Sequence, residues 1–327
     1  AGGVDTLSAM GHALAHRGPD GSGMWVDEVA QIGMTHQRLA IVDLSAAGNQ
    51  PMVSELGRYV ISFNGEIYNH NELRVKLKYN NFKGNSDTET ILECVEEWGL
   101  ETALKEAVGM FAFALWDRRE SKLHLARDRL GEKPLYYGWQ GEGHGRSFLF
   151  GSELKALKVH PSFSSEVNRD AVALFLRHNY IPAPYSIYQG ISKLLPGTIL
   201  TVSLDDKHPK ISPYWSVDDI LEKRSQSPYK YSDETLLEDL EAQLMQSIKR
   251  QMVADVPLGA FLSGGIDSSL IVSLMQHQSN SPIKTFTIGF SESGYNEAEY
   301  ARAVANHLKT DHTELYISSK TAMEVIP

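Results

Sequence analysis

The chain has 327 residues, of which 42% are hydrophobic and 22% are charged, and its formal net charge is −10. This composition is typical of a folded globular protein and too apolar for a disordered one. Because phosphate backbones are bound by clustered Lys and Arg, the acidic balance disfavours nucleic acid as a partner, and we expect small-molecule substrates.

The single cysteine excludes an intrachain disulfide, which favours a reducing compartment and makes the cytoplasm the expected location. No stretch approaches the run of about 20 apolar residues that a membrane-spanning helix needs, so no membrane association is expected. The opening residues lack the basic and apolar pattern of a signal peptide.

In the first part of the chain, short segments rich in β-branched and aromatic residues predict strands. These segments lie between residues 23 and 64 and at 110–116, 123–126 and 135–138. A helix is predicted over 86–98, where Ser86 can cap the helix and Glu89 can complete a capping box. Cys94 falls on the apolar stripe of this helix, so we expect it to be buried. Grouped helices and strands predict an α+β domain over residues 1–204.

Between residues 205 and 231 the composition changes to Asp, Lys, Ser and Pro, which predicts a linker. Beyond this segment the pattern alternates between helices and strands. Helices are predicted from 232, at 268–278 and at 297–307, and strands at 258–262, 283–289 and 312–317. This alternation predicts a second domain, residues 232–327, with a parallel sheet built from βαβ units.

The sharpest local signal is Ser263-Gly264-Gly265-Ile266-Asp267-Ser268-Ser269, placed between a predicted strand and a predicted helix. Two glycines allow a tight turn that brings backbone N–H groups close to an anion, and the helix N-terminus adds its positive dipole end. Asp267 suits a Mg²⁺ ligand. The loop lacks the Lys of a Walker A motif and the third Gly of a dinucleotide fingerprint. The alternative is a plain tight turn in which Asp267 and Ser268 cap the helix.

With this loop, the second domain resembles the asparagine synthetase family, whose members cleave ATP to AMP and pyrophosphate. The resemblance implies ATP and Mg²⁺ as cofactors, with the pyrophosphate held by the loop and the adenosine contacted by the backbone of two strands. The implied ATP-binding residues are Phe261, Leu262, Ser263, Gly264, Gly265, Asp267, Ser268, Ile288 and Gly289, with Asp267 as the Mg²⁺ ligand.

Six further motifs follow one another in the first domain. They are His16-Arg17-Gly18-Pro19-Asp20, His36-Gln37-Arg38-Leu39-Ala40-Ile41-Val42-Asp43, Phe63-Asn64-Gly65-Glu66-Ile67-Tyr68-Asn69, Ser86-Asp87-Thr88-Glu89, Arg127-Asp128-Arg129-Leu130-Gly131 and Ser152-Glu153-Leu154-Lys155-Ala156-Leu157. This series is similar to that of class II glutamine amidotransferases, which use an N-terminal cysteine as nucleophile. The resemblance implies an Ntn-hydrolase-like αββα sandwich of antiparallel sheets.

Hydrolysis of an amide through a thioester needs donors aimed at the developing oxyanion, and an Asn side chain beside a Gly N–H supplies such a pair. The resemblance assigns this role to Asn64 and Gly65. It implies that Arg38 binds the carboxylate of glutamine and that Glu66 and Asp87 bind its ammonium group. Further implied glutamine contacts are Leu39, Ile41 and Val42.

Taken singly, these residues have simpler interpretations. Asn64-Gly65 is a common hairpin-turn dipeptide, Asp87 suits a helix N-terminus, and Arg38 could be a surface charge. The shared order of the six motifs favours the site over these interpretations.

The nucleophilic cysteine of this family is absent from the chain, which opens at Ala1. Cys94 cannot replace it, because a buried structural thiol is inert. Either a short upstream segment carries the cysteine or glutaminase activity has been lost, and the retained glutamine-binding residues favour the first. His12 and His16 have the spacing of a metal pair on a predicted helix, but no third ligand accompanies them, and we predict no metal there.

For an intact enzyme the resemblance implies glutamine-dependent asparagine synthesis from glutamine, aspartate and ATP. Ammonia from glutamine would travel through the protein interior to an adenylated aspartate, and the aspartate pocket is expected beyond Pro327. Three alternatives stay open: a relative that acts on another carboxylate, such as a β-lactam synthetase or a sugar or peptide amidotransferase; a sugar-phosphate or phosphoribosyl amidotransferase, which the Ser263–Ser269 loop disfavours; and a non-catalytic glutamine or nucleotide sensor. A homodimer also stays open.

Overall fold

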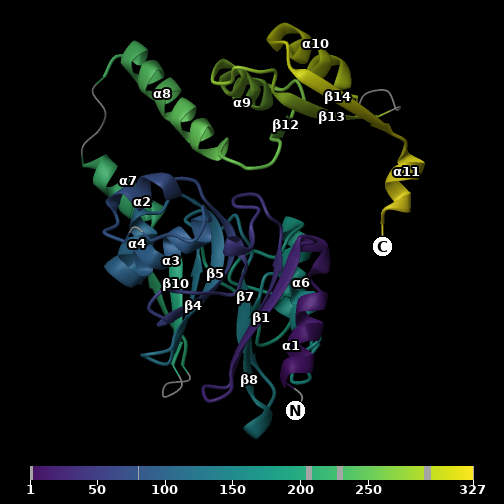
Figure 1. Ribbon diagram of the computed structural model, residues 1–327. Coiled ribbons are helices and arrows are strands. Elements are labelled where there is room, and N and C mark those ends of the chain that lie inside the picture. Colours follow the sequence, from purple (N-terminus) through teal and green to yellow (C-terminus); the bar gives the residue numbers. More distant parts are fainter. Residues whose placement is uncertain (1–2, 80, 204–207, 227–230, 291–295, 327) are drawn as a thin grey trace. The chain divides into compact units, whose positions relative to one another are not determined.

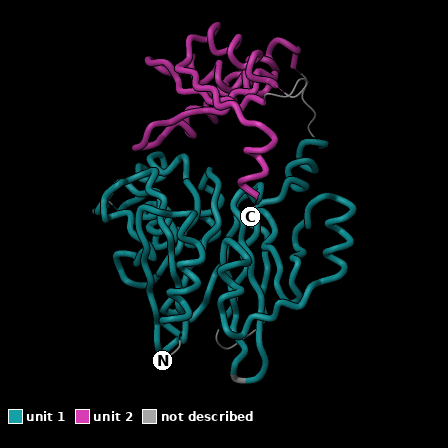
Figure 2. The backbone as a smooth tube through the Cα atoms, turned by 90° about the vertical axis from the view of Figure 1, so that its right-hand side faces the viewer, with its two compact units in different colours: residues 1–228 teal, residues 229–327 magenta. Residues whose placement is uncertain are grey.

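The computed structural model describes residues 3–79, 81–203, 208–226, 231–290 and 296–326. Contacts divide the chain into two compact units, residues 1–228 and residues 229–327 (Figure 2). Each unit has hydrophobic clusters of its own. In the described part, no helix is both long and apolar enough to cross a lipid bilayer.

The first unit is built on a six-stranded antiparallel sheet in the order β11-β10-β6-β5-β4-β3. Its strands are β3 (Met52–Val53), β4 (Tyr59–Ile67), β5 (Gly109–Asp117), β6 (Lys122–Arg127), β10 (Thr198–Ser203) and β11 (Lys210–Pro213). The long central strands β4 and β5 pair along their whole length. Side chains of β4 alternate between two apolar layers, because Ile61 points to one face of the sheet and Val60 to the other.

Two smaller antiparallel sheets face this large sheet. They are the hairpin β1 (Gly21–Asp27) and β2 (Ile32–Arg38), and the three-stranded sheet β8 (Ser147–Gly151), β7 (Tyr136–Gln140) and β9 (Ser192–Lys193). Met34 of β2 and Phe148 of β8 pack in one cluster with Val60, Ala114 and Trp116 of the large sheet. An apolar layer therefore lies between the sheets.

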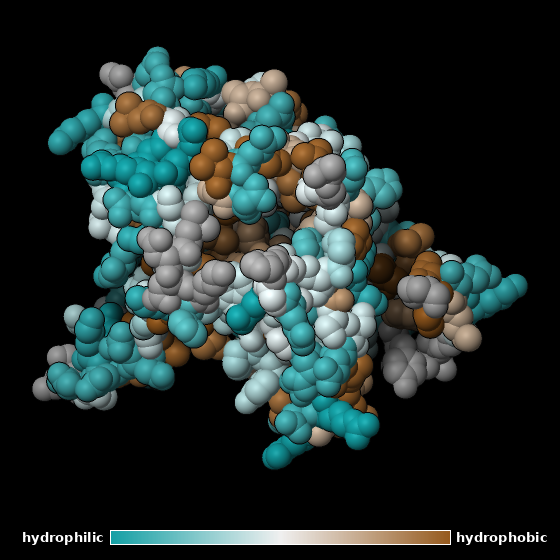
Figure 3. Space-filling view, turned by 90° about the horizontal axis from the view of Figure 1, so that it is seen from below, coloured by the Kyte–Doolittle hydropathy of each residue, from teal (hydrophilic) through white to brown (hydrophobic). Residues whose placement is uncertain are grey.

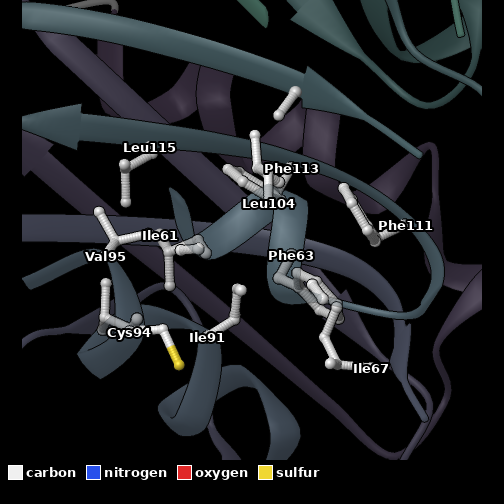
Figure 4. Packing of buried hydrophobic residues seen from close by; sticks show 14 of the residues in the cluster. Ile61, Phe63, Ile67, Ile91, Cys94, Val95, Leu104, Phe111, Phe113 and Leu115 are labelled. Carbon is white, nitrogen blue, oxygen red and sulfur yellow. The ribbon is translucent and has the colours of Figure 1, made fainter. Parts of the chain in front are cut away.

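Helices cover the outer faces of both layers of sheet (Figure 1). Ile91 of α3 and Leu104 of α4 pack on Phe63, Phe111 and Phe113 of the large sheet (Figure 4). On the other side, α1 contacts β2 and α5 contacts β8. The predicted α+β fold with αββα layers is confirmed. The helices are α1 (Gly3–His12), α2 (His70–Lys76), α3 (Asp87–Trp98), α4 (Leu100–Glu106), α5 (Leu154–Lys158), α6 (Arg169–His178) and α7 (Val217–Ser225), with 3-10 turns η1 (Ala15–Arg17), η2 (Ala46–Gly48) and η3 (Gly143–Gly145).

Helix α3 confirms the predicted burial of Cys94, which is fully buried in the helix–sheet cluster (Figure 4). Burial raises the pKa of this thiol to about 12, so it is not a nucleophile at neutral pH. The predicted capping box is wrong in detail. Ser86 Oγ accepts the Thr88 N–H at 3.1 Å, but the Glu89 carboxylate accepts the N–H groups of Lys83 and Gly84 instead of that of Ser86. The Glu89 carboxylate therefore binds the loop that precedes α3 and not the N-cap residue.

The segment predicted as a linker, residues 205–231, contains regular structure in its described part. Strand β11 pairs with β10 at the edge of the large sheet, and α7 follows it. Every residue of β11 is exposed, so the strand lacks the apolar alternation by which it could be found in the sequence. Tyr214, directly after it, is buried in the main cluster of the first unit.

The second unit has a parallel sheet in the order β12-β13-β14, which confirms the predicted βαβ arrangement. Its elements are α8 (Asp233–Gln251), β12 (Gly259–Phe261), α9 (Ile266–His277), β13 (Lys284–Phe290), α10 (Ala298–Leu308), β14 (Asp311–Ile317) and α11 (Ser319–Glu324). Helix α9 begins two residues earlier than predicted, which places Asp267 and Ser268 in its first turn.

The substitution Leu104→Ala should lower the free energy of unfolding of the first unit by about 2–5 kcal/mol, because it leaves a cavity under a fully buried side chain. The matched control is Leu176→Ala on α6, where the side chain is 75% exposed; its effect should stay within about 0.5 kcal/mol. Urea unfolding of the two variants measures the difference. Equal losses would contradict the assigned core.

Candidate active site

A cavity of about 1540 Å³ opens inside the first unit. All seven residues of β2 and all five of β8 line it, and the large sheet contributes residues 62–66 of β4. In the view from below, apolar side chains are visible in a hollow among hydrophilic ones (Figure 3). The structure brings all the residues that were predicted to contact glutamine to this one cavity: Arg38, Leu39, Ile41, Val42, Asn64, Gly65, Glu66 and Asp87.

Arg38, the last residue of β2, is held by the loop that follows it. One guanidinium nitrogen donates to Ser45 O at 2.8 Å and to Asn49 Oδ1 at 3.1 Å, and the other donates to Asp43 O. Among the described residues these bonds leave the Nε–H and one further N–H of the guanidinium unused. These N–H groups can donate to a carboxylate.

Glu66 lies close enough to Asp87 for the charge of Asp87 to act on it. Burial raises the pKa of Asp87 to about 6, and its Oδ2 accepts the Ile67 N–H at 2.8 Å. Burial also raises the pKa of Glu66, and the negative charge of Asp87 raises it further. Two neighbouring carboxylates in a half-buried site favour a cationic ligand, because the cation relieves their repulsion.

Asn64 and Gly65 lie near the end of β4, beside each other on the wall of the cavity. The Asn64 amide reaches Ser152 Oγ only at 3.5 Å, so this contact is weak. Gly65 is required by close approach of β5, since a Cβ atom here would lie 2.1 Å from Met110 O. The pair is therefore fixed by strand pairing and not by the hairpin turn considered from the sequence.

The structure explains why the six motifs occur together. Asp20 accepts the Ala40 N–H at 2.9 Å and so joins the first motif to the second. The Glu153 carboxylate accepts from Arg17 at 2.8 Å and contacts His16 at 3.1 Å, which joins the first motif to the sixth. Asp87 joins the fourth motif to the third through its bond to the Ile67 N–H.

The fifth motif acts through Asp128, which is 1% exposed. Its carboxylate accepts the N–H groups of Phe111, Leu130, Glu132 and Lys133. This arrangement fixes a loop that carries Lys133 into the cavity, where its charge lowers the pKa of Glu66. Lys133 was missed in the sequence, although it stands two residues after the motif.

His36 and Gln50 are two further cavity residues to which the sequence assigned no role. Burial, together with the charge of Arg38, lowers the pKa of His36 to about 4, so its ring is neutral at neutral pH. Gln50 Oε1 accepts the Phe63 N–H at 2.6 Å and its amide donates to Thr88 Oγ1 at 3.2 Å, so this side chain ties β4 to α3. His36 opens the second motif, whereas no local pattern marks Gln50.

The predicted helix that would carry both His12 and His16 is wrong. Helix α1 ends at His12, and His16 lies in the separate turn η1. The ring of His16 instead contacts Glu153 and Lys155, which are distant from it along the chain.

In the second unit, the segment from Ser263 to Ser269 follows the carboxyl end of β12 and includes the first turn of α9, which begins at Ile266. Gly264 has φ +80°, and a Cβ atom on it would lie 2.6 Å from Tyr300 Cβ. Ser263 Oγ and Ser268 Oγ are 2.9 Å apart, and no side chain caps α9. In the described residues Ser269 Oγ is buried without a hydrogen-bond partner. Uncapped N–H groups beside hydroxyls suit an anion.

The residues that were predicted to contact adenosine differ in exposure. Phe261 is 81% exposed and Ile288 is 47% exposed, whereas Leu262 and Gly289 are buried. The backbone of Leu262 is already engaged, because its N–H donates to Phe286 O at 2.9 Å and its carbonyl accepts from Thr287 Oγ1. Any contact from Leu262 must therefore share these groups with the sheet.

Asp87 should make the first unit less stable as the pH rises from about 4 to about 6. The folded protein holds this proton up to about pH 6, while the unfolded chain releases it near pH 3.8, so rising pH favours the unfolded state across this window. In the wild type, the free energy of unfolding should fall across this window by roughly 3 kcal/mol at most. In Asp87→Asn this fall should be absent. Urea unfolding at several pH values measures it, and parallel curves for the two proteins would contradict the assignment.

Comparison with known proteins agrees with this geometry. Residues 2–215 match the family described as glutamine amidotransferase domain, and residues 239–327 match the family described as asparagine synthase. A protein of Methanocaldococcus jannaschii, provisionally named asparagine synthetase (glutamine-hydrolysing) 2, is 37% identical over 98% of this chain and 64% of its own length. Asparagine synthetase (glutamine-hydrolysing) 1 of Bacillus subtilis is 33% identical over 99% of this chain and 49% of its own length.

The solved structure of glutamine phosphoribosylpyrophosphate amidotransferase from Bacillus subtilis, complexed with ADP and GMP, is a distant likeness. It has a TM-score of 0.48 and 14% identity, and covers 97% of this chain and 89% of that chain. The chain spans only about half to two thirds of the length of the two sequence relatives. Since the match covers residues 2–215 of 327, the chain belongs to the glutamine amidotransferase domain family.

Proposed function

We propose that this chain is part of a glutamine-dependent asparagine synthetase, in which the first unit hydrolyses glutamine and the second unit binds ATP. The observation that carries the proposal is the convergence of Arg38, Asn64, Glu66 and Asp87, from three separate segments, on one cavity. A guanidinium group, an amide donor and two carboxylates match the carboxylate, the reacting carbonyl and the ammonium of glutamine.

In the proposed reaction a thiolate attacks the side-chain amide carbon of glutamine. The Asn64 amide and the Gly65 N–H stabilise the oxyanion that forms, ammonia leaves, and water hydrolyses the thioester to glutamate. Arg38 orients the α-carboxylate, and Glu66 and Asp87 orient the ammonium group. Because both carboxylates have raised pKa values, binding of the ammonium group should strengthen as the pH rises through about 6.

The cavity also supports a location for the thiol. In the described residues β2 has no strand partner except β1, and β8 has none except β7. Apart from a single bridge between Pro19 and Arg38, each strand therefore has an unpaired edge, and residues of both strands line the cavity. Such edges bind an extended segment through main-chain hydrogen bonds. Gly3 also lines the cavity, and so does Ile32. Ile32 is the first residue of β2, whereas Arg38 is its last. An extended segment that carries the cysteine and adds to one of these edges would bring its thiol into the cavity.

In the second unit, ATP would lie at the carboxyl ends of the parallel strands, with its pyrophosphate portion on the Ser263–Ser269 loop. Asp267, in the first turn of α9, would hold Mg²⁺ beside the phosphates. The side-chain carboxylate of aspartate would be adenylated with release of pyrophosphate, and ammonia would then displace AMP to give asparagine. The chemistry of another carboxylate acceptor would use the same two units.

Glutaminase activity is tested on the native, full-length protein after its mass and N-terminal sequence are determined. We expect an N-terminal cysteine and release of glutamate from L-glutamine that a thiol alkylator abolishes. An N-terminus without cysteine and no release of glutamate would instead favour a sensor or an ammonia-dependent synthetase.

In that protein Asn64→Ala should lower kcat by about 10²–10³ with little change in KM, because the lost donor acts on the transition state. The matched control is Asn168→Ala, which removes the N-cap of α6 outside the cavity and should leave kcat unchanged. A kcat for Asn64→Ala within about threefold of the wild type would remove Asn64 from the oxyanion site.

Binding of ATP by the chain should depend on Mg²⁺, and Asp267→Asn should remove most of this dependence while leaving metal-free binding nearly unchanged. Titration calorimetry with ATP, in the presence of Mg²⁺ or of a chelator, separates metal-dependent binding from metal-free binding. Equal effects of the substitution under both conditions would mean that Asp267 only caps the helix.

A further inference from the structure

Asp43 lies between the two parts of the glutamine site, at the end of the second motif, and the proposed reaction gives it no role. It is 7% exposed and has φ +58°, a left-handed conformation that Asp tolerates better than most residues. Its carbonyl accepts a hydrogen bond from Arg38, and its carboxylate accepts from Ser45 and Asn85, which stand in the loops beside the site. Its burial, its left-handed backbone and its hydrogen bonds distinguish Asp43 from a residue in an ordinary surface turn.

On one side, Asp43 organises the loop that holds Arg38. The Asp43 carbonyl accepts directly from the Arg38 guanidinium. Asp43 Oδ1 accepts the Ser45 N–H at 2.9 Å and the Ser45 hydroxyl at 2.6 Å, while the Ser45 carbonyl accepts from Arg38 at 2.8 Å. Gly48 closes around the same guanidinium, because a Cβ atom there would lie 2.1 Å from it. The orientation of Arg38 therefore depends on Asp43.

On the other side, Asp43 holds the turn that leads into α3. Its Oδ2 accepts the Asn85 N–H at 2.7 Å, two residues before Asp87. Gly84 lies so close that a Cβ atom on it would be 2.1 Å from Asp43 Oδ2. Asp87 in turn accepts the Ile67 N–H at 2.8 Å, which connects the turn to β4. One carboxylate thus links the segment of Arg38 to the segment of Asp87.

The ionised form of Asp43 is the one that makes these bonds. Burial opposes its ionisation, but the hydrogen bonds from Ser45 and Asn85 and the charge of Arg38 together lower its pKa below the ordinary value. Hydrogen bonds to a charged acceptor are about twice as strong as neutral ones. The link should therefore stay intact throughout the neutral pH range.

We infer that Asp43 is a positioning residue that sets the separation between Arg38 and Asp87, and thereby selects a ligand with a carboxylate and an ammonium group on one carbon atom. This inference rests on the proposed function. Two groups that bind one small ligand cooperate only when their separation is fixed in advance, because otherwise each bond must order its own segment. Asp43 fixes this separation through its hydrogen bonds to the two segments, and it does not contact the ligand itself.

The test compares Asp43→Ala with the wild-type chain in titration calorimetry, using L-glutamine and glutaramate, which lacks the α-ammonium group. Asp43→Ala should raise the Kd of L-glutamine by at least about tenfold, equal to about 1.4 kcal/mol, and that of glutaramate, which uses only the Arg38 contact, by a smaller factor. The preference for L-glutamine should therefore fall. Asp43→Asn keeps an acceptor for Ser45 but turns a donor towards the Asn85 N–H, so it should shift the preference in the same direction by less.

Asp117→Ala is the matched control. Asp117 is also a buried carboxylate, 3% exposed, which accepts from Arg58 at 2.7 Å and from the Arg119 N–H at 2.9 Å, and it does not line the cavity. Its loss should lower the melting temperature as Asp43→Ala does, without a change in ligand preference.

An unchanged preference in both Asp43 variants, with only a lower melting temperature, would overturn the inference and leave the proposed function intact. A wild-type chain that binds neither compound would overturn both.

Discussion

The central strands of the six-stranded sheet are buried on both faces, and this constraint determines where polar groups of the first unit can lie. From Phe111 to Asp117 every residue of β5 is buried, between the helices on one side and the smaller sheets on the other. An unpaired polar group in such a layer would cost several kcal/mol. The site therefore lies where strands end: Arg38 closes β2, Asn64 and Glu66 stand near the end of β4, and Asp87 begins α3.

Buried carboxylates hold the loops around this site, where no strand pairing is available to satisfy the backbone. Asp128 accepts four backbone N–H groups and fixes the loop before Lys133. Asp43 accepts from Ser45 and Asn85, on two different loops. Asp87 differs from Asp43, since burial raises the pKa of Asp87, whereas hydrogen bonds and the charge of Arg38 lower the pKa of Asp43. A carboxylate whose hydrogen bonds outweigh the effect of burial is suited to holding loops, whereas one whose ionisation is opposed by burial is suited to binding a cation.

The second unit relies on backbone shape more than on side-chain charge. Gly264 allows the turn after β12 to pass close to Tyr300 of α10, and the first turn of α9 offers N–H groups that no side chain caps. Loops at the carboxyl ends of parallel strands are the usual place for such sites, because the strands all end at one edge. The buried hydroxyl of Ser269, which has no partner within the described residues, lies in the same turn.

The sequence by itself determined the two kinds of sheet, the burial of Cys94 and the set of candidate site residues, because hydrophobic periodicity and short motifs are local signals. It missed the strand β11, whose exposed residues carry no periodicity, and it assigned Glu89 to a capping box and His12 and His16 to one helix. Only the tertiary structure decided which motifs meet, how the Arg38 guanidinium is occupied, and that Lys133, His36 and Gln50 share the cavity. These facts depend on contacts between residues distant in the chain, such as Asp43 with Asn85, and on burial that no local pattern encodes.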